Sequence, residues 1–111
     1  MGGSMMIFGD AVRLRIFLSN DDTDGRQPLY ETILIAARHA RLAGAIVLRG
    51  VSGYGRSEHI HGVFHGFAFD LPVVVEIVDT EARINDWLPT LEGLLRGGLV
   101  TIENVQTLEK S

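Results

Sequence analysis

Two kinds of hydrophobic spacing alternate along this chain, and their order is what most limits its fold. Residues 11–19 (AVRLRIFLS) carry an aliphatic side chain at every second position, which is the spacing of a half-buried strand. Pro28 then opens a segment whose apolar stripe has the spacing of a helix buried on one side. The same succession returns in the second half, so the predicted order is β-α-β, a long connection and β-α-β.

Glycine, threonine and proline mark the expected ends of the two helices. Gly44 is predicted to end the first helix as a left-handed cap, and Thr80 to begin the second as its N-cap. Pro89 removes one helical hydrogen bond and is expected to kink or split the second helix, which Gly97 and Gly98 then end.

Three further strands complete the predicted sheet. Two βαβ units commonly form one four-stranded sheet with both helices on the same face. We therefore predict an α+β fold, a ferredoxin-like βαββαβ two-layer sandwich with a long loop between its second and third strands. These strands are expected at residues 45–52, 72–79 and 99–106.

Composition indicates one folded domain and limits its partners. The chain has 111 residues, 46% of them hydrophobic and 22% charged, as is typical of a globular domain. We expect residues 11–106 to form it, residues 1–10 a flexible leader and residues 107–111 a frayed tail. The net charge of −4 disfavours nucleic acid, because its binders usually carry a basic surplus.

The expected location follows from two absences in the sequence. No cysteine is present, which fits a reducing compartment and excludes a thiolate metal site. No apolar run approaches the roughly 20 residues that span a bilayer, and the N-terminus does not read as a signal peptide. We expect a cytoplasmic protein without direct membrane insertion.

One face of the predicted sheet has no helix to cover it. Its residues mix apolar groups with charges of both signs, which suits neither a fully wet face nor a fully internal one. Self-association would cover the apolar part and could pair the charges across subunits, whereas a wet face with a few apolar residues is the alternative. The predicted residues are Arg13, Arg15, Phe17, Val74, Glu76, Val78, Thr101 and Glu103.

The connection over residues 53–71 is longer than compact domains normally use, which is often a sign of function. Its start is rich in glycine, and glycines let backbone N–H groups turn toward an anion. Arg49 or Arg56 could add a bidentate contact to phosphate, and Tyr54 could stack on a base. A hairpin turn with glycines at positive φ explains the same residues equally well.

Three histidines, His59, His61 and His65, follow within the same connection. Histidine is a common ligand of transition metals, and HxH on an extended segment puts two imidazoles on one side. The spacing matches no specific metal motif, so solvated or ligand-facing histidines are the favoured interpretation.

No catalytic motif is recognisable, so no enzymatic activity is predicted. The sequence has no GxSxG elbow and no cysteine nucleophile. Asp79 and Glu81 flank the start of the second helix, where carboxylates favour the positive end of the helix rather than form an acid–base pair.

Several segments together resemble the PII-like proteins grouped as domain of unknown function 190. The likeness covers about residues 12–105, and the pairing of RGxxGxG with DLPVVVEIVD is fairly specific, whereas either motif alone is weak. The segments are Arg49-Gly-Val-Ser-Gly-Tyr-Gly, His59 and His61, Asp70-Leu-Pro-Val-Val-Val-Glu-Ile-Val-Asp79, and Gly98-Leu-Val-Thr101.

The resemblance implies a homotrimer that assembles around the open sheet faces and binds an adenine nucleotide in clefts between subunits. It also implies that the long loop contacts a target protein, such as a membrane transporter, and that no cofactor is required. Where PII proteins carry basic residues after their second ligand loop, residues 99–103 (LVTIE) carry none, which favours AMP or ADP over a triphosphate. The ligand-binding residues predicted in this way are Arg49, Gly50, Gly53, Tyr54, Gly55, Arg56, His59, His61, Gly97 and Gly98.

A second family of similar fold offers an alternative. The divalent-ion tolerance proteins are also trimers, and the likeness to them implies a metal site built from His59, His61 and His65.

Overall fold

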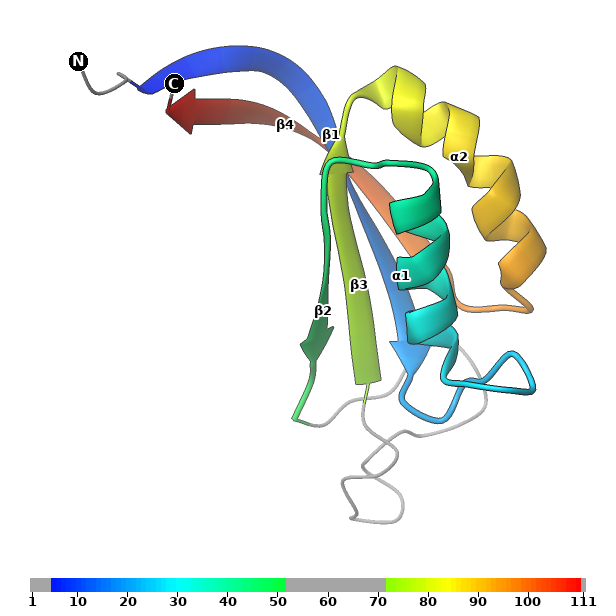
Figure 1. Cartoon of the computed structure of the whole chain (residues 1–111). Helices are drawn as coiled ribbons and strands as arrows, with labels where there is room; N and C mark the ends of the chain where they lie inside the picture. Colours follow the sequence, from blue (N-terminus) through cyan, green and yellow to red (C-terminus); the bar gives the residue numbers. More distant parts are fainter. Residues whose placement is uncertain (1–4, 52–71, 111) are drawn as a thin grey trace.

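The computed structural model describes residues 5–51 and 72–110, and the structural statements below concern those residues. Their strands form one antiparallel sheet in the order β2-β3-β1-β4, with both helices against one of its faces (Figure 1). The predicted ferredoxin-like βαββαβ sandwich is therefore confirmed. The elements are β1 (Met5–Ser19), α1 (Leu29–His39), β2 (Ala45–Arg49), β3 (Pro72–Asp79), α2 (Glu81–Leu94) and β4 (Leu99–Lys110).

The core lies between the sheet and the helices. Alternate residues of β1 and β3 are fully buried there, as the period-two pattern predicts, and one stripe of each helix closes over them. Complete burial of one such aliphatic side chain contributes about 1.5–3 kcal/mol. The largest fully buried side chains are Leu14, Ile16, Ile33, Val73, Val75, Ile77 and Ile84.

The opposite face of the sheet carries a chain of ion pairs. Arg13 Nη2 lies 2.6 Å from Glu103 Oε1, Arg15 Nη1 lies 3.4 Å from the same oxygen, and Arg15 Nε lies 2.9 Å from Glu76 Oε2. These groups come from three neighbouring strands of one chain. The charges are thus paired within a single subunit, whereas the sequence suggested pairing across subunits.

Apolar side chains surround these ion pairs. Phe17 and Leu99 face each other across β1 and β4, and each is 37% exposed. Ile46 and Leu48 of β2, 52% and 47% exposed, join the same face because they pair with Glu76 and Val74. We call Phe17, Ile46, Leu48 and Leu99, with the ion pairs between them, the open face.

The outer strands extend beyond their predicted limits. β1 and β4 pair from Phe17 and Leu99 out to Met5 and Lys110, with one register shift between Ile7 and Gly9. Residues 5–10 and 107–110 are therefore strand, beyond the strand limits of 11–19 and 99–106 that the sequence indicated, and the division of the chain into leader, domain and tail stays a prediction. Each strand supplies hydrogen-bond partners for the other. The residue pattern of either segment alone does not show this pairing, because the partner lies at the other end of the sequence.

Arg41, not Gly44, is the left-handed cap of α1. Arg41 has φ 59°, its N–H donates to the carbonyl of Arg38, and the N–H of Leu42 donates to that of Ala37. These two bonds form a Schellman motif, whose left-handed residue must follow the helix end directly. The prediction for Gly44 was wrong because that residue lies three positions too late.

Helix α2 begins as predicted and remains in one piece. The hydroxyl of Thr80 accepts a hydrogen bond from the backbone N–H of Arg83, so the predicted N-cap is confirmed. The helix runs through Pro89 without a break, so the alternative of a split helix was wrong. Buried Ile84, Trp87 and Leu91 hold it to the core on both sides of the proline.

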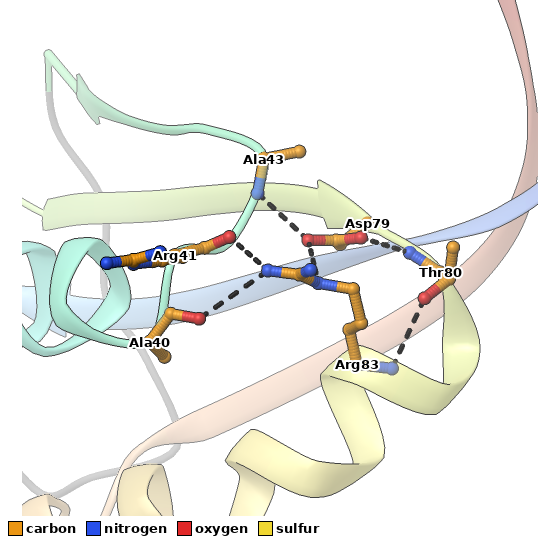
Figure 2. Close-up of polar contacts among 6 residues, drawn as sticks. All are labelled: Ala40, Arg41, Ala43, Asp79, Thr80 and Arg83. Carbon is orange, nitrogen blue, oxygen red and sulfur yellow. Dashed lines mark hydrogen bonds and ion pairs between the residues drawn. The ribbon is translucent and has the colours of Figure 1, made fainter.

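A charged cluster joins α1, β3 and α2 at one end of the sheet (Figure 2). Asp79 is 8% exposed, and its carboxylate accepts hydrogen bonds from Ala43 N at 2.9 Å, Thr80 N at 2.7 Å and Arg83 Nε at 3.1 Å. Arg83 Nη2 also donates to the carbonyls of Ala40 and Arg41. The cluster satisfies orphan carbonyls at the end of α1, where a positive charge is favourable.

Candidate functional site

The strand ends that border the predicted loop meet at the other end of the sheet. β1 ends at Ser19 beside Pro72, the first residue of β3, and β2 ends at Arg49 beside Val73. β4 starts at Leu99 beside Phe17, so it enters the sheet from the same end. The described residues of the predicted ligand site therefore lie at one end of the molecule, opposite the Asp79 cluster (Figure 1).

Arg49 is held there by two side chains from other segments. Its Nη2 donates to the hydroxyl of Tyr30 at 2.8 Å, its Nη1 donates to Oδ1 of Asn20, and its guanidinium carbon lies 5.1 Å from the centre of the Tyr30 ring. Both acceptors are neutral, and the side chain is exposed. The guanidinium is thus oriented without being neutralised by these partners, which suits it to an anionic ligand.

Tyr30 and Asn20 were not predicted as site residues. No motif joins them to Arg49, because they lie 19 and 29 residues before it in the chain. The available signal was topological, since α1 begins at the same sheet end where β1 and β2 stop. A search for side chains near that end would have found both.

The turn after β1 is fixed by its own carboxylates. Asp24 accepts hydrogen bonds from the hydroxyl of Thr32 and from the backbone N–H groups of Gln27, at 3.0 Å, and Arg26, at 2.8 Å. The bond from Thr32, followed by the two backbone bonds, lowers the pKa of Asp24 to about 2. Asp22 accepts from the N–H of Ser19 at 2.8 Å. Asn20 is therefore presented to Arg49 by a braced turn.

At two of the predicted site glycines, Gly50 and Gly98, the local backbone geometry itself requires a residue without a side chain. A Cβ on Gly50 would lie 2.6 Å from Cγ of Pro72, whose rigid ring cannot easily move, and the N–H of Gly50 donates to the Pro72 carbonyl at 2.8 Å. Gly98 has φ 101°, and a Cβ there would lie 3.1 Å from the carbonyl oxygen of Phe17. Gly97 faces open space.

The structure divides the predicted site between two edges of the sheet. Arg49 and Gly50 end the edge strand β2, whereas Gly97 and Gly98 precede the opposite edge strand β4. Two strands lie between them, which corresponds to about 14 Å at the usual strand spacing. Within one chain, Arg49 with Gly50 and Gly97 with Gly98 thus lie at the same end of the sheet but at its opposite edges.

The other predicted residues lie outside the described residues. They are Gly53, Tyr54, Gly55, Arg56, His59, His61 and His65. Within residues 5–51 and 72–110 there is no group of three or more metal-ligating His, Cys, Asp or Glu side chains. Among the same residues, no helix is long and apolar enough to cross a membrane.

The helix layer carries two shallow hollows of about 470 and 380 Å³. Trp87 lines both, and its buried Nε1 has no hydrogen-bond partner among the described residues. These hollows lie between α1 and α2, so they are separate from the strand ends around Arg49.

Comparisons with known proteins identify the family of this chain. The family model described as "DUF190: Uncharacterized ACR, COG1993" matches residues 11–107. A UPF0166 protein of Aquifex aeolicus is 39% identical over 97 residues, which cover 86% of this chain and 90% of the relative.

Among solved structures, the chain resembles two PII-like proteins. One is CPII, a nitrogen regulatory PII-like protein from Thiomonas intermedia K12 bound to ADP, AMP and bicarbonate, with a TM-score of 0.61, 16% identity, and coverage of 94% of this chain and 91% of that one. The other is a putative PII-like signaling protein from Thermus thermophilus, with a TM-score of 0.58, 16% identity, and coverage of 88% and 89%. These likenesses show that the fold is PII-like.

Proposed function

The chain belongs to the DUF190 family, and on that premise we propose that it is a regulatory protein, not an enzyme, that binds AMP or ADP between the subunits of a homotrimer. The observation that carries this proposal is the division of the site between two sheet edges. A small ligand can use both Arg49 and the Gly97–Gly98 turn most directly when a neighbouring subunit brings its β4 edge beside the β2 edge of the first.

The open face supports the self-association that this cleft requires. Its four apolar residues are each more than a third exposed, and an apolar group of this kind on a sheet gains from being covered. The ion pairs among Arg13, Arg15, Glu76 and Glu103 already balance one another, so burial would leave no isolated charge.

The exposed guanidinium of Arg49 favours an anionic ligand in this proposal, and two further findings favour a nucleotide with a short phosphate chain. A guanidinium can bind phosphate through two parallel hydrogen bonds, and that of Arg49 is exposed and oriented. Residues 99–103 add no positive charge on the opposite edge. CPII, which shares the fold, binds ADP and AMP.

In this proposal the loop over residues 53–71 transmits the signal. Nucleotide bound at the base of the loop would change which target protein the loop can contact, in the cytoplasm and without a required cofactor. A membrane transporter is one candidate target.

Thermal unfolding with AMP, ADP and ATP, each with a chelator, tests the nucleotide. A ligand at 100 times its dissociation constant should add about 2.7 kcal/mol of stability, and Arg49→Ala, if it weakens binding tenfold to a hundredfold, should reduce this gain to about 0.4–1.4 kcal/mol at the same ligand concentration. Sedimentation equilibrium of the same samples should show a trimer. A monomer at high micromolar concentration, or no shift with any nucleotide, would overturn the proposal.

A shift with zinc or copper that His59→Ala plus His61→Ala removes would support the metal-binding alternative instead.

A further inference from the structure

The short connection from α2 to β4 carries an arginine to which no role has been given so far. Figure 1 shows this connection between the end of α2 and the start of β4, and Arg96 lies in it, directly before Gly97. The side chain of Arg96 is exposed, and it makes no hydrogen bond or ion pair with any residue that the structure describes. Its positive charge therefore stands free beside the Gly97–Gly98 turn.

A purely structural role does not account for Arg96. Cations often follow a helix because they can bond its last carbonyls, and the last turn of α2 has no basic residue of its own. Within residues 72–110, however, Arg96 donates to none of those carbonyls, and the N–H of Leu95 donates to the carbonyl of Leu91. Nor does an ion pair join Arg96 to the exposed Glu92, one turn before it. The fold thus gains little from this guanidinium.

The turn next to Arg96 leaves backbone donors free as well. Gly97 and Gly98 are exposed, and the N–H groups of both have no hydrogen-bond acceptor in the described part of the chain. Gly98 has φ 101°, whereas the φ of Gly97 is not positive, and successive N–H groups in a turn of this kind can point toward one anion. The turn offers neutral donors where Arg96 offers charge.

From these features we propose that Arg96 of one subunit and Arg49 of the neighbouring subunit bind the same phosphate group, that of AMP. The inference rests on the proposed function, which brings the β4 edge of one subunit beside the β2 edge of the next. Within one chain the two edges lie about 14 Å apart, and Tyr30 and Asn20 hold the guanidinium of Arg49 at its own edge. The cleft between subunits is where both arginines can reach one phosphate.

The number of charges in this cleft favours the monophosphate. A phosphate monoester carries a charge of about −1.5 to −2 at neutral pH, which two guanidiniums balance. Each further phosphate of ADP or ATP adds negative charge, and residues 99–103 supply no cation to balance it. The protein should therefore bind AMP more tightly than ADP, and tighter binding of ADP would overturn the assignment of the ligand as a monophosphate.

Isothermal titration calorimetry with AMP tests the role of Arg96. Arg96→Ala should weaken AMP binding roughly tenfold or more, because it removes charge-assisted hydrogen bonds to the phosphate. Arg38→Ala is the matched control, since Arg38 is an exposed arginine near the end of α1, at the opposite end of the sheet, and its loss should leave AMP affinity unchanged. Equal AMP affinity of wild type and Arg96→Ala would overturn the role of Arg96 and leave the proposed function standing, whereas a wild type that binds no AMP or ADP would overturn both.

Mixed oligomers test whether the two arginines come from different subunits. Arg49→Ala and Arg96→Ala chains are coexpressed with different affinity tags, and trimers that carry both tags are purified. In either kind of mixed trimer, about one site should bind AMP with wild-type affinity, because one interface then joins an intact Arg49 to an intact Arg96. A site built within one chain cannot be restored in this way, since every chain lacks one of the two arginines. Mixed trimers without a restored site would overturn the sharing of the phosphate between subunits.

Discussion

The two ends of the sheet each hold an arginine in a polar cluster, but the clusters are built differently. At one end, Arg83 pairs with the buried carboxylate of Asp79 and donates to backbone carbonyls at the end of α1 (Figure 2). At the other, Arg49 donates to the neutral acceptors Tyr30 and Asn20 and is exposed. The first arginine is balanced by the chain's own carboxylate, whereas the second keeps a charge that these partners do not balance.

On the proposed function, this difference separates a structural cluster from the proposed binding site. A paired charge that satisfies helix-end carbonyls stabilises the fold and has little left to offer a ligand. An oriented but unbalanced guanidinium contributes little to folding and can gain from an anion. Substitutions at the two ends should therefore affect different properties.

The largest expected effect is on stability at the Asp79 end. Asp79→Ala removes the acceptor of three hydrogen bonds and leaves the donors of Ala43, Thr80 and Arg83 unpaired, which should lower the free energy of unfolding by about 2–4 kcal/mol. Urea denaturation at fixed protein concentration measures this. The exposed Asp86→Ala on α2 is the control and should change stability by less than about 0.5 kcal/mol. Equal stability of wild type and Asp79→Ala would remove the distinction between the two ends.

Next in size is the loss of affinity at the Arg49 end. Arg49→Ala should weaken AMP or ADP binding roughly tenfold to a hundredfold, because a charge-assisted hydrogen bond contributes about 1.5–3 kcal/mol. Arg49→Lys should fall between, since lysine keeps the charge but cannot bind in a bidentate way. Isothermal titration calorimetry measures the affinity, with urea denaturation of the same variants as the control. A loss of stability as large as that of Asp79→Ala would mean that Arg49 is structural after all.

A smaller effect is expected at the residue that orients Arg49. Tyr30→Phe keeps the ring beside the guanidinium but removes the hydroxyl acceptor, so nucleotide affinity should fall by about twofold to tenfold, the equivalent of one ordinary hydrogen bond. The same titration measures it. Unchanged affinity would show that Asn20 and the β2 end position Arg49 without Tyr30.

The smallest effect concerns acid stability in the turn beside Arg49. Because the folded pKa of Asp24 is about 2, below its ordinary value of 3.8, its ionised form stabilises the fold above pH 3.8, and this contribution is lost as the pH falls toward 2. Asp24→Asn should flatten the fall of the melting temperature in that window and leave its pH dependence at neutral pH unchanged. Parallel curves for wild type and variant between pH 4 and 2 would contradict the assigned bonds.

Local patterns predicted the framework of this protein well. The β-branched residues of segment 72–79 identified β3 with the bounds that the structure has, and Thr80 was recognised as an N-cap from its type and place. Arg49 was assigned to the base of the connection, and it lies where β1 and β2 end and β3 begins; its role as a ligand contact stays a prediction. All of these depend on residues close together in the chain, which is why a pattern can detect them.

The amino-acid sequence by itself determined the order of the elements and which side of β1, β3 and β4 is left uncovered by the helices, because spacing along the chain sets which side chains share a surface. Only the tertiary structure decided that Tyr30 and Asn20 meet Arg49, that Arg83 reaches the carbonyl of Arg41, and that β1 and β4 stay paired out to Met5 and Lys110. Those contacts join residues far apart in sequence, and it is the packing of the whole sheet and its helices that brings them together.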